Sequence, residues 1–184
     1  SEQGITSIAI DKLVPYRDHR FTLYKGERLE DMIQSIKKNG IITPIIVRTM
    51  DNGKYEILSG HNRVYAAGQA GITSVPAVVK TDLSDEDAEI YVVETNLIQR
   101  GFKDLKISEQ AFAVGLRYNK LFDERKLKGI NDELYLIENG KPNPDADVPV
   151  EHLTTIEATA EQYGISSATV ARLLRVNKLI DEFK

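Results

Sequence analysis

The apolar positions in the first part of the chain follow the spacing of a helix that is buried along one side. They recur at intervals of three and four residues, at Leu29, Met32, Ile33 and Ile36. This spacing places them on one face of a helix. Gly40 follows the stripe and is a typical helix end. The pattern therefore predicts an amphipathic helix over residues 27–39.

The apolar, β-branched runs that follow this helix predict strands. They occupy residues 41–47, 55–58 and 74–80. Turn residues at positions 51–54 separate the first two runs and predict a hairpin. An alanine-rich helix over residues 61–69 should connect the second strand to the third. We therefore predict a small α/β domain over residues 1–82.

The remainder of the chain, residues 83–184, is predicted to be helical. A serine followed three residues later by an aspartate is a capping start for a helix over residues 84–100. A second helix is expected over residues 108–122. Glycine, asparagine and proline are frequent in residues 123–152, which we interpret as a loop or insertion with a short helix around residues 134–137. The predicted fold class is α+β, an α/β domain followed by an all-α domain.

Residues 154–178 have the spacing of a helix-turn-helix. The positions that this motif requires are small or apolar here, at Ala160, Gly164, Ile165, Val170 and Leu173. A small residue lets the two helices cross closely, glycine makes the turn, and the apolar residues pack the helices together. Ser166 can cap the second helix. The motif indicates DNA reading, and the alternative is a plain helical hairpin with solvated arginines.

The local charge is positive in the segment where DNA contacts are expected, although the chain as a whole is acidic. The formal net charge is −4, so DNA binding does not follow from the bulk charge and needs a local basic face. Residues 167–178 contain three basic residues and no acid, which supplies such a face. The residues expected to contact DNA are Ser166, Ser167, Thr169, Arg172, Arg175 and Lys178.

The composition excludes several other classes of function. The chain has no cysteine, so it has no disulfide or thiol chemistry, and its three histidines are too scattered for a zinc site. No apolar run reaches the ~18 residues of a membrane helix, and we expect a cytoplasmic protein without a membrane partner. Because the chain begins at Ser1 rather than Met, we also expect it to be a piece of a longer protein.

A candidate anion site lies where the second predicted strand meets its helix. Gly60 follows the strand directly, and Arg63 lies on the first turn of the helix. Unpaired backbone N–H groups and the positive end of the helix dipole at such a junction suit a phosphate. The plainer alternative is that Gly60 is a turn glycine and that Arg63 pairs with a nearby carboxylate.

Four blocks of sequence carry a more specific signal through their order and spacing. They are residues 35–48, 55–63, 70–79 and 94–100. Together they resemble the ParB-type partition proteins over nearly the whole chain. The variant looks closest to proteins of plasmids and other mobile elements of Gram-positive bacteria. The resemblance implies a ParB/sulfiredoxin-like α/β domain followed by the helix-turn-helix domain.

Members of this family bind CTP with Mg²⁺ in the α/β domain. They close as homodimers around double-stranded DNA, as a clamp loaded at a palindromic site. CTP hydrolysis is slow and resets the clamp, and a ParA-type partition ATPase is the usual partner. For this chain, the resemblance implies a CTP-gated clamp that segregates a plasmid or chromosome, associated with the nucleoid or the plasmid.

The resemblance also implies site residues at the matching positions. Those near the nucleotide are Gly40, Thr43, Pro44, Gly60, His61, Asn62, Arg63, Gln99 and Arg100, and those near Mg²⁺ are Glu94 and Asn96. His61 and Asn62 stand where glutamate and arginine are usual, so the loop has one positive charge fewer. Thr95 stands where a metal-side glutamate is expected, and an additional residue separates Asn96 from Gln99.

Two other functions stay open at this point. One is a helix-turn-helix regulator whose α/β domain binds no nucleotide and serves for dimerisation. The other is a phosphotransferase on the same fold, with Glu30 or Glu94 as the catalytic base. Sulfiredoxin chemistry is excluded because it needs a cysteine in the phosphate loop.

Overall fold

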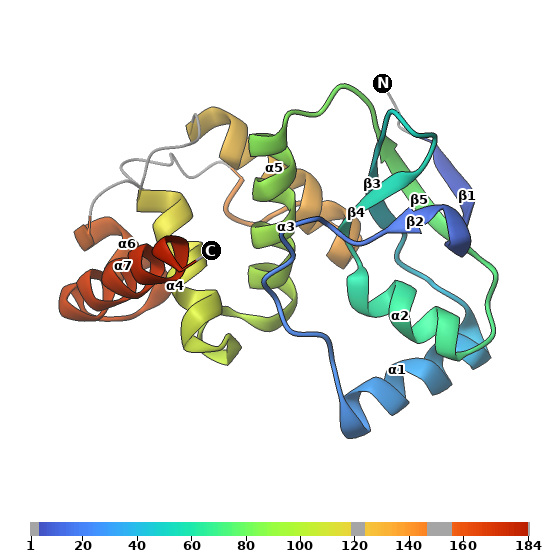
Figure 1. Ribbon diagram of the computed structural model, residues 1–184, viewed down its shortest axis with the longest axis horizontal. Helices are drawn as coiled ribbons and strands as arrows, with labels where there is room; N and C mark the ends of the chain where they lie inside the picture. Colours follow the sequence, from blue (N-terminus) through green and yellow to red (C-terminus); the bar gives the residue numbers. More distant parts are fainter. Residues whose placement is uncertain (1–3, 119–123, 147–155, 184) are drawn as a thin grey trace. The chain divides into compact units, whose positions relative to one another are not determined.

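The computed structural model describes residues 4–118, 124–146 and 156–183 (Figure 1). Contacts between residues divide the chain into two compact units, Ser1–Val92 and Val93–Lys184. This division falls inside helix α3 (Asp85–Arg100), whereas the sequence suggests a boundary at residue 82. Among the residues that the structure describes, no helix is both long and apolar enough to cross a membrane.

The first unit is built on a five-stranded mixed sheet with the strand order β1-β5-β3-β4-β2. Its strands are β1 (Ile5–Ala9), β2 (Leu13–Val14), β3 (Ile45–Thr49), β4 (Tyr55–Ser59) and β5 (Ser74–Lys80), with the 3-10 helix η1 (Ile10–Lys12) between the first two. β3 and β4 form the expected antiparallel hairpin, and β3 pairs in parallel with β5. The three predicted strands are confirmed. β1 and β2 were not predicted, because β1 buries a single residue and β2 has only two residues.

Two helices of the first unit, α1 (Gly26–Asn39) and α2 (His61–Gln69), pack against the sheet (Figure 1). Their buried residues join those of β3 and β5 in one hydrophobic core. The predicted amphipathic helix is therefore confirmed as α1. It ends where expected, because Gly40 has a φ of 69° and its N–H donates to the Ile36 carbonyl at 2.8 Å.

The second unit is helical. After α3 it contains the 3-10 helix η2 (Phe102–Asp104), α4 (Ile107–Tyr118), α5 (Glu124–Asn139), α6 (Ile156–Tyr163) and α7 (Ser167–Glu182). α4, α6 and α7 pack on one another. The predicted helix over residues 84–100 is confirmed as α3, and that over residues 108–122 corresponds to α4. Residues 119–123 lie outside the described part of the chain.

The expectation of a loop over residues 123–152 is wrong where α5 runs. Leu127, Ile130 and Leu134 form a buried stripe along one side of this helix. Gly129 lowers the local helix propensity by about 1 kcal/mol, and burial of the stripe outweighs this cost. The last part of the predicted loop lies outside the described residues.

Helices α4 and α7 approach each other closely at Gly115. A Cβ atom on Gly115 would lie 2.7 Å from Cγ of Asn177, closer than real side chains approach. Asn177 is buried and donates to the Asp181 carboxylate at 3.3 Å. The contact between the two helices therefore requires glycine at position 115.

We expect Gly115→Ala to lower the free energy of unfolding of the second unit by about 1–3 kcal/mol, because the added methyl group overpacks the contact between α4 and α7. Gly129→Ala is the matched control, since Gly129 is also helical but has no atom within 4 Å of the added Cβ. This control should be neutral or stabilising, by up to ~1 kcal/mol. Urea unfolding of the full chain measures the free energy of unfolding of both variants. Equal stabilities would contradict the tight contact.

Residues 15–25 connect β2 to α1 without helix or strand, and we call them the 15–25 loop. Two side chains of α2 hold its backbone. The N–H of Tyr16 donates to Nε2 of His61 at 3.1 Å. The N–H of Tyr24 donates to Oδ1 of Asn62 at 2.8 Å. The loop is therefore fixed near both of its ends by the first turn of one helix.

His61 is neutral in this arrangement, because only the unprotonated ring nitrogen can accept the bond from Tyr16. Its ring stacks on His19 with a centroid separation of 3.7 Å. Burial, and to a smaller extent the neighbouring His19, hold the pKa of His61 well below its ordinary value of 6.5. The imidazole is therefore an uncharged structural acceptor.

This neutral state predicts a pH dependence of stability. The unfolded chain binds a proton at His61 as the pH falls through about 6.5, whereas the folded chain does not. The free energy of unfolding should therefore fall as the pH decreases from 6.5 to 5.5, by up to ~1.4 kcal/mol per pH unit from this residue. His61→Gln keeps an acceptor for Tyr16 but does not titrate, so its stability should vary less. Urea unfolding of both proteins at several pH values tests this, and an identical dependence of the free energy of unfolding on pH would rule out a neutral His61.

Candidate functional site

The junction between β4 and α2 has the geometry expected of a backbone anion site. Gly60 has φ 98° and ψ 23°, a left-handed conformation, and caps α2 without a side chain. A Cβ atom at this position would lie 2.6 Å from Cγ2 of the fully buried Ile45. The first N–H groups of α2 have no carbonyl partner within the helix, and this end of the helix dipole is positive. We call residues 60–63 the Gly60 corner.

Arg63 joins the Gly60 corner to the segment that precedes β3. Its Nη1 donates to the carbonyl of Thr43 at 2.9 Å and to that of Pro44 at 3.1 Å. Its Nη2 donates to Oγ of Ser59 at 3.2 Å. The structure therefore brings Arg63, Thr43 and Pro44 together at the corner, as the resemblance implies, while Gly40 ends α1 a few residues earlier.

The other two side chains of the corner are used differently from the expectation. His61 and Asn62 accept hydrogen bonds from the 15–25 loop. His61 brings no positive charge, and Asn62 offers its amide in place of the usual arginine. Their proposed contacts with a nucleotide stay predictions. In the structure these two side chains hold the loop beside the corner.

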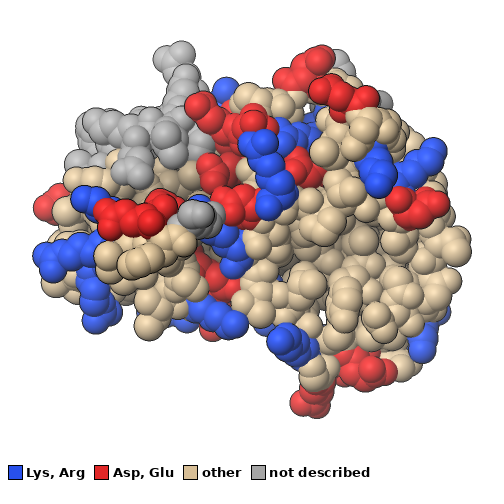
Figure 2. Space-filling view, in the orientation of Figure 1, with Lys and Arg blue, Asp and Glu red and all other residues tan. Residues whose placement is uncertain are grey.

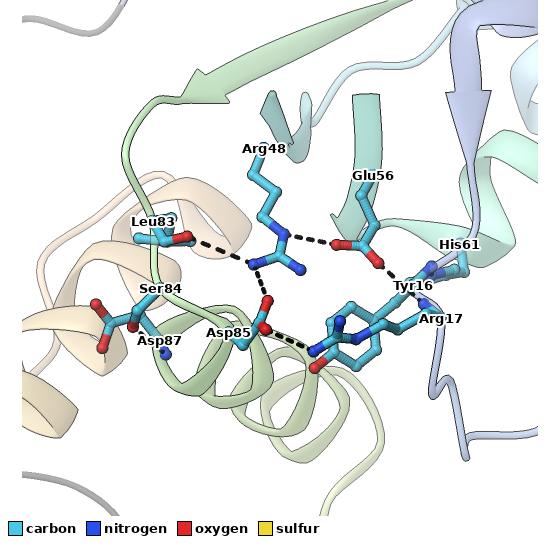
Figure 3. Close-up of polar contacts among 9 residues, drawn as sticks. All are labelled: Tyr16, Arg17, Arg48, Glu56, His61, Leu83, Ser84, Asp85 and Asp87. Carbon is cyan, nitrogen blue, oxygen red and sulfur yellow. Dashed lines mark hydrogen bonds and ion pairs between the residues drawn. The ribbon is translucent and has the colours of Figure 1, made fainter. Parts of the chain in front are cut away.

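A carboxylate–arginine network lies on the same unit, and the sequence analysis did not find it (Figure 3). Glu56 is 2% exposed and binds Nε of Arg48 at 2.6 Å and the N–H of Arg17 at 3.0 Å. Asp85 binds Nη1 of Arg48 at 2.8 Å and Nη2 of Arg17 at 2.7 Å. Hydrogen bonds from Arg17 and then Arg48 hold the pKa of Asp85 below its usual value. Both carboxylates thus bind the same pair of arginines.

The residues predicted from the fourth sequence block lie in the second unit. Nη1 of Arg100 lies 3.8 Å from Oε1 of Glu109, and both side chains are buried. Gln99 is half-buried. Thr95 buries a hydroxyl for which the described residues offer no hydrogen-bond partner. The role of Gln99 and Arg100 at a nucleotide stays a prediction.

The predicted metal ligands, Glu94 and Asn96, are both buried, and their role at Mg²⁺ stays a prediction. Mg²⁺ needs about six oxygen donors in octahedral order. Glu94 and Asn96 are only 2% and 6% exposed, and Nδ2 of Asn131 donates to Oε2 of Glu94 at 2.8 Å. Across the described residues, no three or more His, Asp or Glu side chains are grouped to hold an ion.

The helix-turn-helix predicted at residues 154–178 corresponds to α6 and α7. Gly164 makes the turn with a φ of 61°. Ser166 caps α7, since its Oγ accepts from the N–H of Thr169 at 3.2 Å and lies 2.9 Å from Oγ1 of the same residue. Val170 and Leu173 are buried as expected. Residues 154 and 155 lie outside the described part of the chain.

The basic residues predicted to contact DNA lie on the exposed side of α7. Arg172, Arg175 and Lys178 are exposed, as are Ser166 and Ser167, and Thr169 is half-buried. Figure 2 shows basic side chains, with acidic ones beside them, at the left of the view where Figure 1 draws α7. The helix therefore presents a local positive face on a chain of negative net charge.

Comparison with known proteins supports the resemblance seen in the sequence. The sequence model of the family described as the ParB N-terminal domain matches residues 1–96, just over half of the chain. A nucleoid occlusion protein from Bacillus mycoides (strain KBAB4) is 31% identical over 182 residues, which are 99% of this chain and 51% of that protein. A nucleoid occlusion protein from Geobacillus sp. (strain WCH70) is 29% identical over 98% of this chain and 52% of that protein. The chain thus spans about half the length of the curated relatives it matches.

One solved structure supports the same fold. The C-terminally truncated chromosome-partitioning protein ParB from Caulobacter crescentus, complexed to the centromeric parS site, aligns with a TM-score of 0.51 and 24% identity. The alignment covers 92% of this chain and 70% of that one. The same protein complexed with CTP-gamma-S aligns with a TM-score of 0.46 and 24% identity, over 94% of this chain and 77% of that one. From the match of the family model to residues 1–96, we conclude that the chain belongs to the ParB N-terminal domain family.

Proposed function

We propose that this chain is a ParB-type DNA-binding protein that binds CTP at the Gly60 corner and reads a palindromic DNA site with α7. In this proposal it acts as a homodimeric, CTP-gated clamp in the segregation of a plasmid or chromosome, with a ParA-type ATPase as partner and a location on the nucleoid or plasmid. The observation that supports it most is the Gly60 corner, where the start of α2 and an oriented arginine suit an anion, in a chain whose α6 and α7 have the spacing of a helix-turn-helix.

The Gly60 corner offers two kinds of contact to a triphosphate. The backbone N–H groups at the start of α2 can donate to phosphate oxygens, and the absence of a side chain at Gly60 permits close approach. Arg63 is held beside them through the carbonyls of Thr43 and Pro44, and its fork of donors suits phosphate oxygens. The segment from Gly40 to Pro44 would then lie beside the base. Mg²⁺, when bound with the nucleotide, would neutralise part of the phosphate charge.

The second unit would supply the DNA contacts. Arg172 on the exposed face of α7 is proposed to reach base edges in the major groove together with Ser167 and Thr169. Arg175 and Lys178 would bind the phosphate backbone, which contributes salt-dependent affinity. Two copies related by a twofold axis would match the symmetry of a palindromic site.

One observation favours a second candidate, a DNA-binding regulator whose α/β domain binds no nucleotide. His61 is neutral and, like Asn62, already bonded to the 15–25 loop. The corner therefore has Arg63 as its one basic side chain within residues 60–63. A binding measurement with CTP separates the two functions.

We expect Arg63→Ala to weaken CTP binding at least tenfold, because a charge-assisted hydrogen bond to phosphate is worth about 1.5–3 kcal/mol. DNA binding in the absence of CTP should be unchanged, since the substitution lies outside the second unit. Gln69→Ala is the matched control, an exposed polar residue at the other end of α2, and should keep CTP affinity. Isothermal titration calorimetry measures the CTP affinity of the native chain and of the two variants. Equal CTP affinity in Arg63→Ala would count against the corner.

We expect Arg172→Ala to weaken binding to the specific DNA site by about 5- to 150-fold, which corresponds to ~1–3 kcal/mol for one base contact. CTP binding should be unchanged. Lys37→Ala removes the same charge from an exposed position on α1 and should keep DNA affinity. The duplex is first selected by the native chain from a random pool and then titrated by fluorescence anisotropy. Unchanged DNA affinity in Arg172→Ala would refute the assignment of α7 as the reading helix.

A further inference from the structure

The second unit contains a cleft of about 440 Å³, whose described lining shares no residue with the Gly60 corner or with the predicted DNA contacts. It lies among α3, η2, α5 and α6, and its lining residues all belong to the second unit. We call it the Glu94 cleft, after the acidic residue of α3 that lines it. Pockets for small organic molecules have volumes of about 300–1,000 Å³ and combine apolar walls with a few polar groups. The Glu94 cleft has the size of such a pocket.

The cleft lies along one face of α3. The residues of α3 that line it are spaced three and four apart, at Glu94, Leu97, Ile98 and Gly101. A helix turns by about 100° per residue, which puts Asn96 on the opposite side of α3 from Glu94. A ligand in the cleft would therefore contact a different face of α3 from the one that carries Asn96.

The buried end of the cleft holds a carboxylate. Glu94 is 2% exposed, and its Oε2 accepts a hydrogen bond from Nδ2 of Asn131 on α5 at 2.8 Å. Nδ2 of Asn143 donates to Oδ1 of Asn131 at 3.2 Å and so orients the Asn131 amide. A carboxylate accepts several hydrogen bonds, and those from a cationic donor are the strongest. An ammonium group therefore suits Glu94 better than a neutral or an anionic group.

The rest of the lining favours the same kind of ligand. Leu97 and Phe102 supply apolar surface, while Lys103 and Asp104 are exposed and carry opposite charges. With Glu94, the lining thus has two acidic residues and one basic residue. A matching ligand carries a positive charge on an apolar body.

One side of the cleft is formed by the end of α6, the first helix of the predicted helix-turn-helix. Gln162 and Tyr163 line the cleft and directly precede the turn at Gly164. The ring of Tyr163 stacks on that of Phe102, with centroids 4.1 Å apart and an angle of 12° between the planes. A ligand in the cleft would therefore touch α6 beside the aromatic contact between this helix and η2.

We propose that the Glu94 cleft binds a small organic cation, an amine with an apolar body, and that the bound ligand stabilises the packing of α6 on η2. The ammonium group binds the carboxylate of Glu94, and the apolar body lies against Leu97 and Phe102. This site goes beyond the proposed function, because its ligand needs neither CTP nor DNA to bind.

Three probes that share an indole ring and differ in one group test the preference for a cation. Tryptamine carries an ammonium group, tryptophol a hydroxyl group and indolepropionate a carboxylate. Each is titrated into the full chain without nucleotide or DNA, and proton–nitrogen correlation spectra report the amide signals. Tryptamine should shift the signals of residues 97–104 and 162–164 and bind about three- to thirtyfold more tightly than tryptophol, because a hydrogen bond between charged groups is the stronger one. Indolepropionate should not bind. Equal affinities, or no shifts in these residues, would overturn the site.

Three substitutions test the assigned residues. Glu94→Gln keeps an acceptor for Asn131 but removes the charge, so the preference for tryptamine over tryptophol should disappear. Glu157→Gln is the matched control, because it removes an exposed carboxylate from α6, and it should keep the preference. Leu97→Trp fills the cleft from a half-buried position and should prevent binding of every probe. A preference that persists in Glu94→Gln, or binding that persists in Leu97→Trp, would refute the assignment.

Amide hydrogen exchange measures the effect of the ligand on α6. Opening of α6 removes one wall of the cleft, so tryptamine at about ten times its dissociation constant should slow exchange in this helix by about tenfold. Exchange in α1, a helix of the first unit, should be unchanged and serves as the internal control. Tryptamine that binds without slowing exchange in α6 would rule out the proposed stabilisation of this helix.

Discussion

The close approach of Gly60 to Ile45 is the constraint on which the site in the first unit depends. β4 ends and α2 begins directly above a side chain that is fully buried in the core. Only a residue without a Cβ atom can turn the chain there, in a left-handed conformation. The position of the first turn of α2 follows from this, and with it the directions of His61, Asn62 and Arg63. A packing requirement of the hydrophobic core therefore places the polar groups of the proposed phosphate site.

The three side chains after Gly60 bind two different segments of the backbone. Arg63 binds backbone carbonyls of the segment before β3, while His61 and Asn62 bind backbone N–H groups of the 15–25 loop. A neutral imidazole and an amide are suited to the second task, because each can accept a hydrogen bond without bringing a charge into a buried place. His61 and Asn62 stand where glutamate and arginine are usual in the family. In this chain both side chains hold the 15–25 loop.

The features that the sequence predicted correctly are those set by neighbours along the chain. The stripe of α1, the junction at Gly60 and the turn at Gly164 each follow from local spacing and backbone preference. The network around Glu56 was missed because its partners come from distant parts of the chain. α5 was missed because its glycine and asparagine content resembles a loop, and the burial of its apolar stripe outweighs that content.

The close approach of Gly115 to the side-chain amide of Asn177 fixes how α7 packs on α4. The residues that would meet DNA lie on the opposite, exposed side of that helix. The contact with α4 and the proposed DNA contacts therefore lie on separate faces of α7. If α7 reads DNA as proposed, substitutions on its exposed face could change the recognised DNA sequence during evolution without altering the contact between α4 and α7.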